Sequence, residues 1–153
     1  MQLTIFRLHE TMTNPISKSV GAIILNNKKE VLLLFQLKNS YWEFPKGKID
    51  PGEEEREAFV REMREETGII HFSYVPGFRE EVTFSFRFGG QIIDRHVAYY
   101  CILTDDPVRL SPEHTRFQWV TVEEADGMLR HENARILLRK AIEAAGRAEH
   151  QEV

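Results

Sequence analysis

The sequence has little cysteine, no long apolar run and no excess of basic residues. Cys101 is the only cysteine among 153 residues, which excludes an intrachain disulfide framework and a cysteine-rich zinc site. No stretch of about 18 apolar residues is present, so we expect no membrane-spanning helix. The first 15 residues also lack the long apolar segment of a secretory signal. These features fit a protein of the reducing cytoplasm best.

The charge balance is mildly acidic. Twenty basic and 24 acidic side chains give a net charge of −4, which argues against broad binding to long nucleic acid. A few local cations could still hold a phosphate ligand. Composition is that of an ordinary globular chain, without repeats or linker-like stretches. We therefore expect one domain over residues 1–153, with its core at about 17–147.

Hydrophobic patterning predicts strands, then one helix, then strands, then two helices. The expected strands are residues 19–25, 31–35, 42–44, 82–88, 92–103 and 117–120. The expected helices are residues 53–67, 121–129 and 134–145. Gly68 should end the first helix, and Thr121 with Glu124 should cap the second. The fold class is α/β, a mixed β-sheet with helices on both faces.

Residues 47–69, GKIDPGEEEREAFVREMREETGI, carry the candidate chemistry. Glu62, Glu65 and Glu66 have the spacing i, i+3, i+4, which places them on one face of a helix. Their mutual repulsion would be removed by a hard divalent cation. Mg²⁺ prefers carboxylate oxygens and bridges to phosphates, and Mn²⁺ could replace it. The pattern predicts a magnesium face that receives a polyphosphate, with a solvated acidic surface as the alternative.

The segment before this helix supports the same hypothesis. Lys46 and Lys48 flank Gly47 and are expected to bring two cations and a flexible backbone to phosphoryl oxygens. Solvated surface lysines are the alternative for both. Glu53 could reach back from the loop to Arg61. Arg61 itself is expected to project at another angle from the helix than the three glutamates.

The segment resembles the Nudix box, G-x5-E-x7-R-E-U-x-E-E-x-G-U, in which U is a bulky apolar residue. Every specified position is filled, by Gly47, Glu53, Arg61, Glu62, Met63, Glu65, Glu66, Gly68 and Ile69. A chance match to the seven fixed positions is on the order of 10⁻⁹ per starting point.

The resemblance implies a single Nudix-like α/β/α sandwich and Mg²⁺-dependent hydrolysis of a nucleoside diphosphate linked to another group. It implies that Glu62, Glu65 and Glu66 bind the metal, with the backbone carbonyl of Gly47. It also implies that Glu53 and Arg61 brace the loop against the helix. Which glutamate acts as the base varies within the family and is left open.

Three further segments resemble the diadenosine tetraphosphate hydrolase branch of this family. Residues 42–47 are similar to its W-x-x-P-K-G entry, which RNA and diphosphoinositol pyrophosphohydrolases share in part. Residues 77–80 are similar to its G-F-x-E segment, and residues 110–119 to its L-S-x-E-H…W pattern. The resemblance implies that Glu113 is an extra metal ligand or base, with a solvated loop residue as the alternative. His114 could bind phosphate or be structural.

A nucleobase needs an aromatic face, which stabilises it by about 1–3 kcal/mol. Phe84, Phe86, Tyr99 and Tyr41 are the candidates for this role, and core packing is their alternative. The branch holds the base with tyrosines on the strands after the box, whereas this chain has phenylalanines on the first of them. Arg87, Arg95 and His96 near the 89–90 turn could contact a phosphate tail, and exposed charges at a strand end are the equal alternative.

The leading hypothesis is an asymmetric bis(5′-nucleosyl)-tetraphosphatase that converts diadenosine tetraphosphate to ATP and AMP. The rival is another Nudix pyrophosphohydrolase acting on nucleoside triphosphates, ADP-ribose or 5′-triphosphate RNA. A catalytically silent nucleotide-binding module and a scaffold with an acidic face are the non-enzyme alternatives. The expected partner is a small nucleotide polyphosphate, with no membrane or long nucleic acid. The chain is expected to be a monomer or a homodimer.

Overall fold

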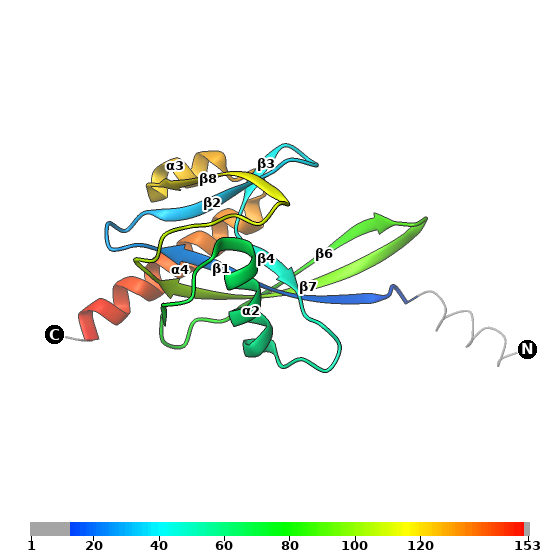
Figure 1. The fold of residues 1–153 in the computed structure, drawn as a ribbon, viewed down its shortest axis with the longest axis horizontal. Helices are drawn as coiled ribbons and strands as arrows, with labels where there is room; N and C mark the ends of the chain where they lie inside the picture. The colour runs from blue at the N-terminus through cyan, green and yellow to red at the C-terminus, as the bar shows by residue number, and fades with distance from the viewer. Residues whose placement is uncertain (1–12, 152–153) are drawn as a thin grey trace, which may run out of the picture.

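The computed structural model describes residues 13–151, which form one continuous sheet and three helices (Figure 1). The strands are β1 (Ile16–Leu25), β2 (Val31–Gln36), β3 (Tyr41–Glu43), β4 (Lys46–Lys48), β5 (Ser73–Tyr74), β6 (Glu80–Phe88), β7 (Gln91–Leu103) and β8 (His114–Val120). The helices are α2 (Glu55–Thr67), α3 (Val122–Met128) and α4 (Glu132–Gln151). The expectation about a signal segment in the first 15 residues falls mostly outside the described part.

The sheet is mixed, as predicted. Its centre is the parallel pair of β1 and β7, in register from Ile16↔Asp94 to Leu25↔Leu103. The predicted hairpins join β1 to β2 and β6 to β7, and both pairs are antiparallel. β8 adds to β2, and β4 adds to β1.

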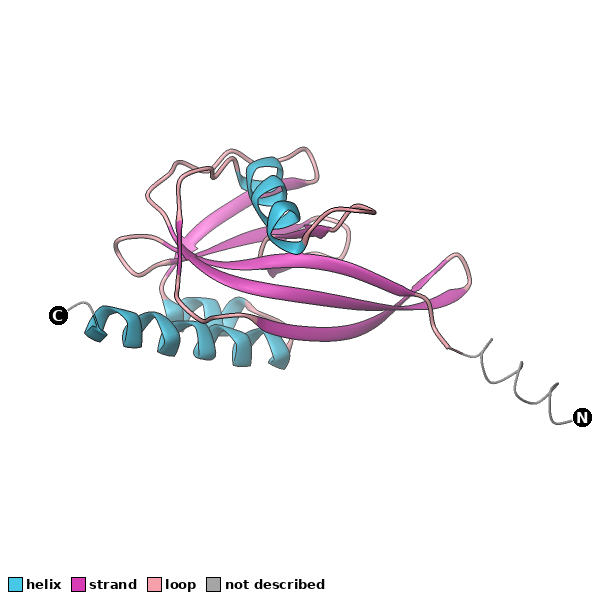
Figure 2. Cartoon of the chain, turned by 90° about the horizontal axis from the view of Figure 1, so that it is seen from below, coloured by secondary structure: helices cyan, strands magenta, loops and turns pink. Residues whose placement is uncertain are grey.

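Helices cover both faces of the sheet, which confirms the predicted architecture (Figure 2). Successive side chains of a strand point to opposite faces, so each central strand feeds two apolar clusters. One cluster joins Val20, Ala22 and Ile24 of β1 to Ala58, Phe59 and Met63 of α2. The other joins Ile23 and Leu25 to Leu137, Leu138 and Ala141 of α4. The two faces of β1 therefore hold α2 and α4 on opposite sides.

The helix ends follow the predicted signals closely. Gly68 takes the left-handed conformation, with φ of 75°, and its N–H donates to the carbonyl of Arg64. Thr121 and Glu124 form the predicted capping box of α3. α2 begins at Glu55 rather than Glu53, because Glu53 lies in the turn before the helix.

Two short strands were not predicted, and one of them changes the site. Residues 46–48 were expected to be a flexible loop, but Gly47 pairs with Val20 as part of β4. A glycine between two lysines has no strand propensity of its own, so tertiary pairing decides here. β5 is too short to have a pattern. β8 begins at His114 rather than Phe117, through pairing with Gln36 of β2.

None of the helices within residues 13–151 is long and apolar enough to cross a bilayer.

Candidate active site

The first feature of the site is a close approach between β4 and α2. The carboxylate of Glu62 lies where a Cβ of residue 47 would be, so a larger residue there would displace this carboxylate. Gly47 is fixed there by its pairing with Val20. Glu62 is thereby buried, with 6% of its surface exposed. Pairing of β4 to the sheet thus places the backbone of Gly47 against one glutamate of the acidic face.

Arg61 holds the acidic residues together. Its Nε and Nη2 atoms donate to the two carboxylate oxygens of Glu53, at 2.7 and 2.8 Å. Its Nη1 donates to Glu62 at 2.8 Å and to Glu65 at 3.0 Å. Nη2 also donates to the carbonyl of Lys48 at 2.9 Å. The reach of Glu53 to Arg61 is as predicted, whereas the expected divergence of Arg61 from the glutamates is wrong. The long side chain folds back across them.

The electrostatics of Glu53 follow from this arrangement. Hydrogen bonds from Arg61, and then one from the backbone N–H of Asp50, lower the pKa of Glu53 to about 2. The hydrogen bonds that Arg61 donates to Glu53 also raise the pKa of Arg61 itself. The pair therefore stays ionised at neutral pH and ties the 50–53 turn to α2.

Glu62, Glu65 and Glu66 differ sharply in exposure. Burial raises the pKa of Glu62, and repulsion from Glu66 and Glu65 adds to this, while Arg61 opposes it. Glu66 is also buried, whereas the side chain of Glu65 is 51% exposed. Within residues 13–151, no three His, Cys, Asp or Glu side chains already converge as a ligand set. The guanidinium of Arg61 donates to oxygens of both Glu62 and Glu65 in this arrangement.

The donor set nevertheless fits a divalent cation. Two carboxylates one helical turn apart are held in a partly desolvated space, where a second positive charge would relieve their repulsion. Glu65 lies on the exposed side of the same helix face, held by its hydrogen bond from Arg61. The absent side chain of Gly47 lets the Glu62 carboxylate lie close to the backbone of β4.

Glu66 belongs to a second buried network, which sequence analysis did not find. Ser111 donates to Glu66 at 3.2 Å. Nδ1 of His114 lies 3.3 Å from Glu66, and Nε2 lies 3.8 Å from Glu43. These two carboxylates, Glu43 first, raise the pKa of His114 to about 9. His114 therefore faces two carboxylates instead of open solvent.

The residue missed in this network is Glu43, which is 9% exposed. It also accepts a hydrogen bond from Gln36 at 2.9 Å. An acidic residue between Trp42 and Phe44, in an otherwise apolar strand, was the signal that could have identified it. Glu113 lies in the turn before β8 and is exposed, and no hydrogen bond or ion pair joins it to another residue of the described part.

The predicted binding residues gather on the other face of the sheet. Lys46 Nζ lies 5.0 Å from the centre of the Phe84 ring, and the Arg95 guanidinium lies 4.5 Å from that of Phe86. Burial lowers the pKa of Lys46. Nε of Arg95 is buried without a hydrogen-bond partner in the described residues. Two cations and two aromatic rings thus lie together beside β4.

Tyr99 and Lys48 lie differently from these residues. Tyr99 is 8% exposed, and its ring packs against Gly21 and, in an edge-on contact, Phe44. Burial raises the pKa of its hydroxyl. Lys48 is exposed and contributes its carbonyl to Arg61. Tyr99 thus packs in the core, and the Lys48 side chain lies on the surface. These are the alternatives to the binding roles that the sequence suggested.

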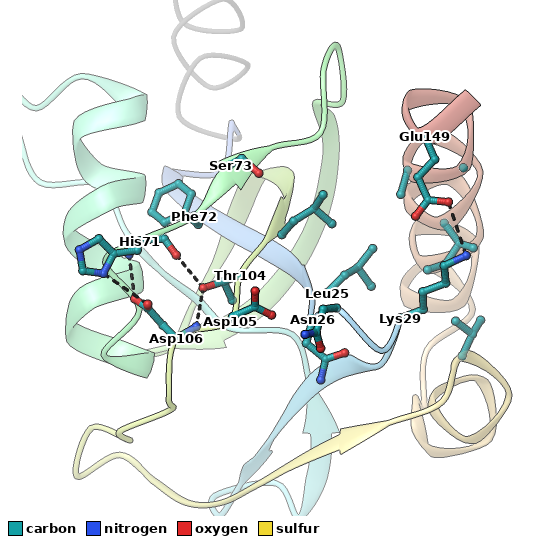
Figure 3. Close-up of a pocket in the computed structure, with 16 residues that line it drawn as sticks. Leu25, Asn26, Lys29, His71, Phe72, Ser73, Thr104, Asp105, Asp106 and Glu149 are labelled. Carbon is teal, nitrogen blue, oxygen red and sulfur yellow. Dashed lines mark hydrogen bonds and ion pairs between the residues drawn. The ribbon is translucent and has the colours of Figure 1, made fainter. Parts of the chain in front are cut away.

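A cavity of about 680 Å³ lies elsewhere, between α4, the β1–β2 turn and the ends of β5 and β7 (Figure 3). None of the predicted site residues lines it. Its charged residues are largely paired with each other, as in His71–Asp106 at 3.3 Å and Lys29–Glu149 at 3.4 Å. The cavity therefore offers no catalytic set comparable to the acidic face of α2.

Comparison with known proteins agrees with this geometry. The family model described as the NUDIX domain matches residues 15–140. The chain is 35% identical to the mouse asymmetrical bis(5′-nucleosyl)-tetraphosphatase over 108 residues, 66% of this chain and 71% of that protein. It is 30% identical to the Caenorhabditis elegans protein of the same name over 131 residues, 82% of this chain and 94% of that protein. A crystal structure of a C. elegans Ap4A hydrolase binary complex is similar, with a TM-score of 0.67, 29% identity and coverage of 81% of this chain and 93% of that one.

Proposed function

The chain belongs to the Nudix hydrolase family, and on that premise we propose that it cleaves dinucleoside polyphosphates asymmetrically, converting diadenosine tetraphosphate (Ap4A) to ATP and AMP. Nudix hydrolases act on small nucleotide polyphosphates and generally use divalent metal ions. For this chain we propose Mg²⁺, with Mn²⁺ as a substitute, and a cytoplasmic location.

The observation that carries the proposal is the arrangement around Arg61. One guanidinium ties Glu53, Glu62 and Glu65 together at 2.7–3.0 Å, directly beside the backbone of Gly47. The glycine at residue 47 lets the Glu62 carboxylate lie against the backbone of β4, a contact that a solvated acidic face would not need. This arrangement supports a role for the whole segment in catalysis.

Glu62, Glu65 and Glu66 would hold the cation, with the carbonyl of Gly47. When bound, the ion would neutralise phosphate charge and lower the pKa of a bound water. Proton transfer and the positioning of the carboxylates would be the task of residues of the chain. A carboxylate of α2 would accept the proton of the attacking water, while Arg61 keeps the neighbouring carboxylates in place. Ser111 and His114 would fix the orientation of Glu66 through the contacts described above.

Substrate binding would extend from the acidic face of α2, past β4, to the basic and aromatic face. Lys46 and Arg95 would offset phosphate charge, because both lie beside aromatic rings and lack a close acidic partner in the described residues. Phe84 and Phe86 would provide the apolar surface for a base. This arrangement would allow a long polyphosphate to pass over Gly47 with nucleotides on either side.

The test is a comparison of kcat/KM and products for Ap4A, ATP, ADP-ribose and a 5′-triphosphorylated RNA, each with Mg²⁺. The proposal predicts the highest kcat/KM for Ap4A and equal amounts of ATP and AMP. Two ADP molecules would mean a symmetric cut and would overturn it. A higher kcat/KM for another compound of the panel would mean that the chain is a hydrolase with a different preferred substrate. Binding of Ap4A without turnover would favour the silent module.

A further inference from the structure

Within residues 13–151, no other strand pairs with the outer edge of β6. β6 pairs on one side with β7, in unbroken register from Glu80↔Tyr99 to Phe88↔Gln91, and with no other strand of residues 13–151. Natural sheets usually shield such an edge with proline, lysine, a bulge or a covering element. β6 contains no proline or lysine, and its register contains no bulge. The β6–β7 hairpin also projects beyond the helices (Figures 1 and 2).

The charges of β6 are arranged symmetrically about Phe84. In the strand sequence EEVTFSFRF, Glu81 precedes Phe84 by three residues and Arg87 follows it by three. In an antiparallel pair of two such strands centred on Phe84, Glu81 of each copy lies directly opposite Arg87 of the other. Directly opposite side chains share a face at about 4.5–5.5 Å between Cβ atoms, and opposite charges there are stabilising. The two-fold symmetry makes this ion pair twice.

The remaining side chains match in the same register. Val82 lies opposite Phe86, so that apolar groups meet on one face. Thr83 lies opposite Ser85, so that small polar groups meet on the other. Between Val82 and Phe86, like is therefore matched with like, which is the arrangement that cross-strand pairing favours, while Phe88 lies opposite Glu80.

Neighbouring registers are worse. A shift by two residues in one direction places Arg79 opposite Arg87, which is repulsive. A shift by two in the other direction places Glu81 opposite Gly89 and leaves no ion pair. A shift by one residue puts Val82 opposite a polar side chain. Charge complementarity thus selects the register centred on Phe84.

We propose that the chain forms a two-fold homodimer by antiparallel pairing of the β6 edges, centred on Phe84. Arg87 has no ion-pair partner within the described residues, and Glu81 has only loose ones, Arg79 at 3.5 Å and His96 at 3.7 Å. Phe88 is 69% exposed at the end of the same strand and gains cover from the partner copy. A single strand pair is a small interface, so the dimer forms with increasing concentration rather than permanently.

A charge swap tests the proposal by sedimentation equilibrium across a concentration series. The wild-type mass rises from that of one 17.9 kDa chain toward that of two. Glu81→Arg and Arg87→Glu each replace both attractive pairs by repulsive ones and weaken association by about tenfold or more. The double variant restores the pairs with exchanged signs, and dimerisation returns. Glu143→Arg and Arg147→Glu on α4 are the matched controls, which associate like the wild type.

A wild-type chain that stays monomeric overturns the proposal, as does a dimer that both single variants retain. A double variant that remains as weak as the singles overturns the register. The register is checked independently by mixing Thr83→Cys with Ser85→Cys in oxidised glutathione. The mixture forms a disulfide-linked dimer faster than either variant alone, and Cys101 does not interfere because it is buried. Equal rates in all three samples contradict the register centred on Phe84.

Discussion

Replacing Arg61 with lysine should separate the catalytic role of this side chain from its role in stability. The guanidinium makes a fork of separate N–H groups to Glu53, Glu62 and Glu65, which the compact ammonium of lysine cannot reproduce. Lysine keeps a positive charge beside the carboxylates, and the network reaches water through Glu65, whose side chain is 51% exposed. We therefore expect the free energy of unfolding to fall by only about 1 kcal/mol or less. Displacement of the carboxylates should lower kcat by about a hundredfold.

The assay is kcat on Ap4A with saturating Mg²⁺, together with urea denaturation of the same preparation. Arg64→Lys is the control, because Arg64 lies on the same helix, is exposed and does not contact the glutamates through its side chain in the described residues. It should match the wild type in both measurements. A near-normal kcat for Arg61→Lys would refute the reasoning, since the fork would then have no catalytic consequence.

Three further predictions follow from the same geometry. Gly47→Ala should lower the free energy of unfolding by about 1–3 kcal/mol and abolish turnover, because the added methyl overlaps the Glu62 carboxylate; unchanged denaturation curves would contradict this. Because Glu43 and Glu66 raise the pKa of His114 from 6.5 to about 9, its protonated form stabilises the fold fully below pH 6.5 and loses this contribution as pH rises through about 9. His114→Gln should remove that part of the pH dependence of unfolding, and an identical profile would argue against it. Mg²⁺ should raise the melting temperature of the wild type but much less that of Glu62→Gln, and equal shifts would exclude this metal site.

Sequence patterning predicted the layers because each central strand and helix has its own apolar periodicity. Residues 20–24 alternate between two cores, and Gly68 and Thr121 mark helix boundaries by local chemistry alone. Residues 46–48 show where this information ends. Their strand conformation depends on pairing with β1, in which Gly47 lies opposite Val20, 27 residues earlier in the sequence. Such a distant pairing leaves no pattern in the local sequence.

The candidate site divides in the same way. Spacing on a helix predicted the shared face of Glu62, Glu65 and Glu66, and the turn before the helix predicted the contact of Glu53 with Arg61. The orientation of Arg61 and the burial of His114 required tertiary contacts. Glu43 contacts His114 only because β2 lies between β3 and β8 in the sheet, and this neighbourhood cannot be read from the order of residues.

The most direct test of the central claim is Ap4A hydrolysis with Mg²⁺ by the wild type, Glu66→Gln and Glu57→Gln, measured side by side by product analysis. Glu57 is an exposed glutamate of the same helix and serves as the matched control. We predict equal ATP and AMP from the wild type and from Glu57→Gln. Glu66→Gln should keep its fold and lose turnover by orders of magnitude. Near-normal turnover by Glu66→Gln would contradict the account of the acidic face as the catalytic centre.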